Sequence, residues 1–250
     1  MTFQLDECGE SSWIPDENVR KCQKCHLNFS FLNRRHHCRY CGGIFSGEPC
    51  SFVMGEKYPP AYRGKRICAY CHALYFKYGD MVQEGAEFVK YSRDGKDQHS
   101  RHFWLTDKRG CQTLHWSNSK SSPLVDTARA DGSRSIVLTD VGQVLHFKQA
   151  GTVAESRKLV IKLEGAGPET RDMVLQTTSE QTFERWLEAL EAAHHVSHAN
   201  KMIENGKQEE KRAQEAERQE KIRADRVERL QSAKQHRQAT RDRIRQKYST

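Results

Sequence analysis

The chain has 250 residues, 30% of them charged and 36% hydrophobic, and a formal net charge of +8 at pH 7. Residues 201–250 hold 15 Lys/Arg and 9 Asp/Glu, so this segment carries +6 and the first 200 residues carry only +2. Such a local excess argues against a nucleic-acid-binding domain, which needs a broad basic surface. The sequence has no run of about 18 apolar residues that would span a membrane, and residues 1–12 lack the apolar run of a signal peptide.

Seven of the nine cysteines fall within residues 11–77. Six of them form Cys-x-x-Cys pairs, which are Cys22/Cys25, Cys38/Cys41 and Cys68/Cys71. In a reducing cytosol, paired thiols at this spacing favour tetrahedral zinc over disulfides. The segment is also too small and polar to fold on a hydrophobic core alone. Bound metal therefore has to supply the missing stability.

The segment Arg34–Arg39 reads RRHHCR, with three arginines and two histidines beside a thiol of the second cysteine pair. Planar guanidinium groups bind phosphate oxygens bidentately, and imidazole rings add further donors. A metal ligand within this segment would hold these donors on a rigid support. The sequence therefore predicts a site for an anionic phosphate group on a zinc-built scaffold.

Three elements together resemble the FYVE zinc finger: Trp13–Asp16 (WIPD), Arg34–Arg39 (RRHHCR) and Arg66–Cys68 (RIC). The resemblance implies a small α+β cross-brace finger that binds phosphatidylinositol 3-phosphate on endosomal membranes. It implies that the lipid headgroup contacts Asp16, Arg34, Arg35, His36, His37, Arg39 and Arg66. It also implies that Phe31 and Leu32 insert into the bilayer, while packing of both inside the finger is the alternative.

The resemblance further implies two zinc ions held by interleaved sets of ligands. One set is complete, with Cys38, Cys41, Cys68 and Cys71. The other retains Cys22, Cys25 and Cys50, because Ser46 stands where a thiolate is expected and a serine hydroxyl is a poor zinc ligand. Candidates for the fourth position are His26, Cys8, Glu48 or water, and we expect this zinc to bind more weakly. An open zinc position can be catalytic, but no acid–base pair accompanies it, so we expect no enzymatic activity.

Residues 82–196 alternate short apolar runs with turn-rich stretches, a pattern typical of an antiparallel barrel or sandwich. The expected strands cover Phe88–Tyr91, His102–Leu105, Thr113–Trp116, Ile136–Leu138, Val144–Phe147, Leu159–Leu163 and Met173–Leu175. A closing helix is expected from the helical spacing of Phe183, Trp186, Leu187 and Leu190, after a capping box at Thr178-x-x-Gln181. This arrangement resembles a pleckstrin homology (PH) domain. Lys90, Arg93, Lys96 and Arg101 could form a lipid-binding patch, but we expect a protein-binding or structural role.

Residues 197–250 form the third segment, which is rich in Glu, Gln, Lys, Arg and Ala. Its composition predicts one long, solvated helix. The sparse apolar residues do not keep an a/d register over several heptads, so a homodimeric coiled coil is an alternative rather than the main expectation.

Together these features predict a non-enzymatic adaptor with a FYVE-type finger at 11–77, a PH-like domain at 82–196 and a charged helical tail at 197–250. We expect it to be cytoplasmic and peripheral on early endosomes or on other membranes that display phosphatidylinositol 3-phosphate. The PH-like domain or the tail would bind a protein partner, and no nucleic acid is expected. The alternative is a RING-like cross-brace finger that acts in ubiquitin transfer or as a protein-binding scaffold.

Overall fold

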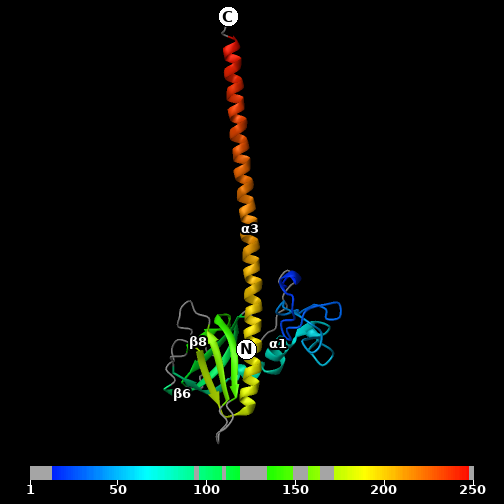
Figure 1. The fold of residues 1–250 in the computed structure, drawn as a ribbon, viewed down its shortest axis with the longest axis vertical. Helices are drawn as coiled ribbons and strands as arrows, with labels where there is room; N and C mark the ends of the chain where they lie inside the picture. Colours follow the sequence, from blue (N-terminus) through cyan, green and yellow to red (C-terminus); the bar gives the residue numbers. More distant parts are fainter. Residues whose placement is uncertain are drawn as a thin grey trace. The chain divides into compact units, whose positions relative to one another are not determined.

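The computed structural model describes residues 13–92, 96–108, 111–118, 134–148, 157–163 and 172–247. The chain divides into two compact units, residues 1–203 and residues 204–250. The first unit contains a small N-terminal module, an antiparallel sheet and the first turns of the last helix, α3 (Figure 1). The second unit consists of the remainder of α3.

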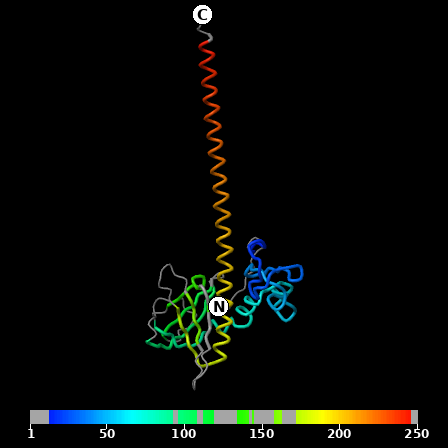
Figure 2. The backbone as a smooth tube through the Cα atoms, in the orientation of Figure 1, coloured from blue at the N-terminus to red at the C-terminus, as the bar shows by residue number. Residues whose placement is uncertain are grey.

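The N-terminal module has short elements joined by loops, as the blue-to-cyan part of the tube in Figure 2 shows. Its strands are β1 (His36–His37), β2 (Ile44–Phe45), β3 (Ser51–Val53) and β4 (Arg66–Cys68), which form the antiparallel pairs β1–β2 and β3–β4. Its helical turns are η2 (Asp16–Asn18), η3 (Pro60–Tyr62), α1 (Ala69–His72), η4 (Ala73–Lys77) and α2 (Gly79–Glu84). The module has little regular structure, so cross-linking through metal has to hold these loops in place.

All seven strands expected in the second module are present. They are β5 (Ala86–Tyr91), β6 (Gln98–Lys108), β7 (Cys111–Ser117), β8 (Arg134–Val137), β9 (Val141–Lys148), β10 (Arg157–Leu163) and β11 (Asp172–Thr177), with the turn η5 (Leu138–Asp140) before β9. The spatial order is β8-β7-β6-β5-β11-β10-β9, with every pair antiparallel. Two meanders, one of four strands and one of three, therefore join where β11 pairs with β5.

The first turns of α3 (Glu180–Lys247) bury the apolar stripe that the helical spacing predicted. Phe183, Trp186 and Leu190 are fully buried, and the Trp186 ring meets the Phe88 ring edge-on at 5.3 Å between centroids. The predicted cap was wrong by one residue. The Oγ of Ser179, rather than that of Thr178, accepts the Thr182 N–H at 3.1 Å, as an N-cap residue does.

From Glu204 to Arg245 the side chains of α3 are exposed, which confirms a solvated helical tail. Its large apolar side chains, Ile222, Val227, Leu230 and Ile244, are each more than half exposed. A dimeric coiled coil through this segment stays a prediction. Among the described residues, no helix has the length and apolar character needed to cross a membrane.

Candidate zinc centres and anion-binding face

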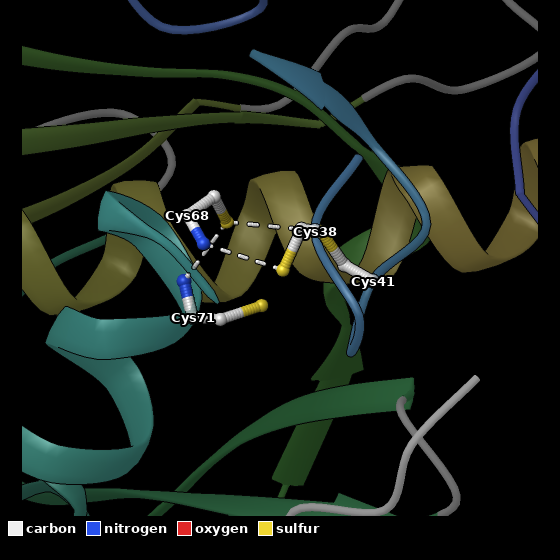
Figure 3. A group of neighbouring side chains, drawn as sticks. All are labelled: Cys38, Cys41, Cys68 and Cys71. Carbon is white, nitrogen blue, oxygen red and sulfur yellow. Dashed lines mark hydrogen bonds between the residues drawn. The ribbon is translucent and has the colours of Figure 1, made fainter. Parts of the chain in front are cut away.

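Four cysteines meet in a closed, fully buried cluster: Cys38, Cys41, Cys68 and Cys71. The first two follow β1, Cys68 ends β4 and Cys71 lies on α1, so the cluster ties three elements together (Figure 3). The Sγ atoms of Cys41 and Cys68 are 3.7 Å apart. A zinc tetrahedron with 2.3 Å Zn–S bonds has edges of about 3.8 Å. The four thiols are therefore spaced to hold one zinc ion.

The pKa values of these four thiols show why the cluster favours a bound cation. Burial opposes ionisation of Cys38, yet hydrogen bonds from the other three thiols outweigh it and hold the pKa of Cys38 well below its usual range. The hydrogen bonds to Cys38 raise the pKa values of Cys41 and Cys71 well above the usual range of a thiol. Without metal the cluster therefore favours one thiolate at the expense of its neighbours. A divalent cation removes this conflict, because it stabilises every coordinating thiolate.

A second cluster joins Cys22, Cys25 and Cys50. Hydrogen bonds from Ser46 and from backbone amides outweigh the effect of burial and lower the pKa of Cys22 to about 6. Burial raises the pKa of Cys50 to about 11. These three thiols also fit one zinc ion, so the two clusters can hold two ions in total. Neither His26 nor Glu48 contributes an atom to this group, and Cys8 lies outside the described residues.

The RRHHCR segment supplies two groups of donors, because successive side chains of a strand point to opposite sides. On one side, His36 lies close to the charges of Arg34 and Arg66. Burial, Arg66 and Arg34 together lower the pKa of His36. The same positive potential that helps to lower the pKa of His36 favours a bound anion. Arg66 reaches this group from β4, where its Nη1 donates to the Ser51 Oγ at 3.3 Å.

The other side of the segment faces the N-terminal arm. His37 stacks on Trp13 with 4.7 Å between ring centroids, and the Arg39 guanidinium lies 4.3 Å from the same indole. The His37 Nε2 is 3.5 Å from the Asp16 carboxylate and 3.0 Å from the Ile14 carbonyl oxygen. Trp13 is therefore a packing residue, and it contacts two of the predicted headgroup residues, His37 and Arg39.

Arg35 contacts two other residues of the finger. Its guanidinium lies 4.9 Å from the Phe29 ring centroid, and its Nε donates to the Val19 carbonyl at 3.4 Å. The side chain is nevertheless exposed. Of the residues predicted to contact the headgroup, Arg34 and Arg66 lie near His36, whereas Asp16 and Arg39 lie on the His37 side of β1.

The loop before the basic segment exposes two apolar side chains. Phe31 is 82% exposed and Leu32 92% exposed, so the alternative that they pack inside the finger is wrong. A tight turn presents them, because the Ser30 N–H donates to the Asn33 carbonyl at 3.0 Å and the Asn33 N–H donates to the Ser30 Oγ at 3.1 Å. The Arg34 guanidinium lies 5.4 Å from the Phe31 ring centroid. The exposed apolar tip of Phe31 and Leu32 therefore lies beside the cationic side chain of Arg34.

Comparison with known families agrees with this geometry. Residues 12–77 match the model of the FYVE zinc finger. These residues form a FYVE zinc finger. Residues 77–196 match the model of the meiotic cell cortex C-terminal pleckstrin homology domain, so a PH-like domain follows the finger. A RING-type finger, the alternative drawn from the sequence, is not supported.

Individual relatives match the finger alone or a longer stretch of the chain. The Homo sapiens zinc finger FYVE domain-containing protein 9 is 39% identical over 62 residues, which cover 25% of this chain and 4% of the relative. The Mus musculus 1-phosphatidylinositol 3-phosphate 5-kinase is 35% identical over 157 residues, covering 62% of this chain and 7% of the relative. A solved PH domain from TgAPH has a TM-score of 0.34 at 12% identity, over 46% of this chain and 86% of that chain. The chain thus spans less than a tenth of the length of these curated relatives.

The basic residues considered for lipid binding by the PH-like domain lie partly within the described residues. Lys90 and His99 are paired across β5 and β6, and Arg101 lies on β6 opposite Phe88. The Arg101 Nη1 donates to the Ser100 carbonyl at 2.7 Å, and the Lys90 Nζ donates to the Tyr91 carbonyl at 3.5 Å. Arg93 lies outside the described residues. A role of this patch in lipid binding stays untested.

Sequence reasoning missed the contacts that join the finger to the PH-like domain. The Tyr75 hydroxyl donates to Asp107 at 2.8 Å, and the Tyr78 hydroxyl donates to Glu188 at 2.6 Å. His195 of α3 stacks on Tyr70 at 4.3 Å between centroids. Among the residues that the structure describes, the buried His195 Nε2 has no hydrogen-bond partner. The aromatic-rich run 70–78 was a signal for these contacts, because tyrosines with buried rings need partners for their hydroxyls.

Proposed function

We propose that this chain binds phosphatidylinositol 3-phosphate on membranes and acts there as a peripheral, non-enzymatic adaptor. The observation that carries the proposal is the pair of cations Arg34 and Arg66 near His36, beside the exposed tip of Phe31 and Leu32. A phosphate on the headgroup would neutralise the cations while the apolar side chains enter the bilayer. The relatives include proteins whose name contains this lipid, which supports the choice of ligand.

Electrostatics favour the bound phosphate for a reason specific to this fold. The complete cysteine cluster anchors the RRHHCR segment through Cys38 and the strand of Arg66 through Cys68, so these donors need little ordering when the ligand arrives. Hydrogen bonds between guanidinium groups and phosphate oxygens are charge-assisted and stronger than neutral ones. A phosphate near His36 would also favour its protonated form, which adds a donor.

Asp16 supports selectivity for a singly phosphorylated ring. Its carboxylate is 59% exposed and lies 3.5 Å from the His37 Nε2, beside the RRHHCR segment. An additional phosphate close to this carboxylate would meet like charge, which disfavours more highly phosphorylated lipids. Inositol hydroxyls, in contrast, can donate to the same oxygens.

The PH-like domain and the helical tail would supply further contacts. Two modest sites that reach the same surface raise overall affinity through effective concentration. We propose that these parts recruit a protein partner and that the finger directs the chain to early endosomes, where the ligand lipid is displayed.

Arg35→Ala tests the headgroup site. We expect the variant to bind liposomes containing phosphatidylinositol 3-phosphate more weakly by roughly 1.5–3 kcal/mol, because a charge-assisted contact is lost. Co-sedimentation across singly and multiply phosphorylated lipids measures both affinity and selectivity. Arg63→Ala is a matched control, since Arg63 is also exposed and its Nε also donates to a backbone carbonyl, that of Tyr58 at 2.8 Å. Equal binding of the Arg35 variant and the wild type would show that the headgroup lies elsewhere.

Replacing Phe31 and Leu32 together with serine tests membrane insertion. Burial of each side chain in the bilayer contributes roughly 1.5–3 kcal/mol, so the double variant should bind liposomes more than about tenfold less tightly. Binding of the soluble headgroup, measured by calorimetry, should be unchanged. Ile222→Ser with Leu230→Ser removes two exposed apolar side chains from the tail and serves as the control. An equal loss in both double variants would argue against insertion through this loop.

A further inference from the structure

Ser46 occupies a distinctive position at the incomplete zinc cluster. It follows β2 directly and is buried, with 8% of its surface exposed. The Ser51 Oγ donates to the Ser46 carbonyl at 2.7 Å, and the Ser46 N–H donates to the Cys22 Sγ at 3.3 Å. The backbone of Ser46 is thus fixed on both sides, which leaves the hydroxyl little freedom to point elsewhere.

The Ser46 hydroxyl contacts the thiols of the cluster at distances that suit a shared metal ion. Its Oγ is 3.3 Å from the Cys22 Sγ and 3.6 Å from the Cys25 Sγ, and the Cys50 Sγ lies within 4.8 Å of both of these thiols. In a tetrahedron with Zn–S bonds of 2.3 Å and a Zn–O bond of about 2.1 Å, the edge between sulfur and oxygen is about 3.6 Å. The three thiols and this oxygen therefore mark the four corners of one site.

We propose that the Ser46 Oγ is the fourth zinc ligand at the cluster of Cys22, Cys25 and Cys50, giving a site with three sulfur donors and one oxygen donor. The hydroxyl would coordinate with its proton retained. Three thiolates already exceed the charge of Zn²⁺, so the ion is a weak Lewis acid and does not readily ionise an alcohol. This assignment revises our expectation from sequence, which looked for the fourth ligand at His26, Cys8, Glu48 or water.

A neutral oxygen donor has a clear consequence for the metal. It binds zinc more weakly than a thiolate does, because zinc is a borderline-soft cation that prefers sulfur. Cys25 is also exposed, whereas all four thiols of the complete cluster are buried. The chain would thus hold one tightly bound zinc and one exchangeable zinc, and loss of the second would leave the first in place.

Stepwise chelation of the full-length chain tests the assignment, with zinc release followed by a chromogenic chelator. The wild type should release one zinc well before the other, and Ser46→Cys should release both together at higher chelator concentration. Ser46→Ala should bind the first-released zinc at least about tenfold more weakly. Ser46→Thr keeps the hydroxyl and should restore most of the affinity. The controls His26→Ala and Glu48→Gln should release zinc as the wild type does.

Cobalt substitution distinguishes direct coordination from a merely structural role of the hydroxyl. The charge-transfer absorption of Co²⁺ grows with the number of thiolate ligands, so Ser46→Cys should show a stronger band than the wild type at full occupancy. Ser46→Ala should lose cobalt from one site while the circular dichroism of the domain held by the complete cluster persists. Unchanged affinity in Ser46→Ala, or no gain of absorption and affinity in Ser46→Cys, would overturn the proposal. A loss of zinc in His26→Ala or Glu48→Gln comparable to that of Ser46→Ala would do so too.

Discussion

Cys41→Ser should unfold the finger and abolish lipid binding. Cys41 belongs to the complete cluster, which is fully buried and joins β1, β4 and α1. Structural zinc in small fingers contributes roughly 10–16 kcal/mol of apparent binding free energy near neutral pH. The module has too small a core to remain folded without most of that contribution. Metal analysis, circular dichroism and liposome co-sedimentation of the purified chain measure the three expected losses.

Cys50→Ser is the comparison variant. It also removes one thiol, but from the cluster of Cys22, Cys25 and Cys50, for which we propose the Ser46 oxygen as the fourth ligand. We expect this variant to lose one zinc and to retain the other, with most of the circular dichroism signal preserved. Equal damage from the two substitutions would mean that the clusters contribute equally to stability. The unequal roles inferred from Ser46 would then be wrong.

The second large effect concerns pH and His195. Burial lowers the pKa of His195 to about 4, below the value of 6.5 expected in the unfolded chain. The unfolded state therefore binds more protons between these two values. Stability that is fully present above pH 6.5 should be lost as the pH falls towards 4, by up to about 3 kcal/mol. Urea unfolding of the wild type at several pH values measures this loss.

His195→Phe should remove this part of the pH dependence. Phenylalanine keeps a ring against Tyr70 and Phe45, which lie 4.3 and 5.4 Å from the imidazole between centroids, but it cannot be protonated. Acid also displaces zinc from thiolates, so the informative quantity is the difference between variant and wild type at each pH. His236→Phe, at an exposed position of α3, is the matched control. A constant difference between His195→Phe and the wild type from pH 7 to 4 would exclude the proposed role.

Local patterns predicted much of the fold because they reflect local physics. Alternating apolar residues and turns predicted the seven strands, and the spacing of Phe183, Trp186 and Leu190 predicted the helix that covers them. These patterns succeed because one face of each element must be buried. The cap was misplaced by one residue, since Thr178 and Ser179 offer the same chemistry and only the backbone geometry selects between them.

The anion-binding face was less accessible to sequence reasoning. The residues of the RRHHCR segment were found from their composition and family resemblance. Their division between two sides of β1, with Trp13 and Asp16 on one and Arg66 on the other, depends on contacts with distant parts of the chain. Likewise, the burial of His195 against Tyr70 joins residues more than 100 positions apart, and no periodicity indicates such a contact.

The sequence by itself determined the zinc-binding character of residues 11–77, because Cys-x-x-Cys spacing constrains two ligands to one metal whatever surrounds them. It also determined the strands, the closing helix and the solvated tail, whose signals lie within a few residues. The tertiary structure alone placed the Ser46 Oγ beside the thiols of the cluster that has only three cysteines. The reason is geometric: Ser46 is 24 residues from Cys22, and only the folded chain fixes the 3.3 Å that separates their side chains.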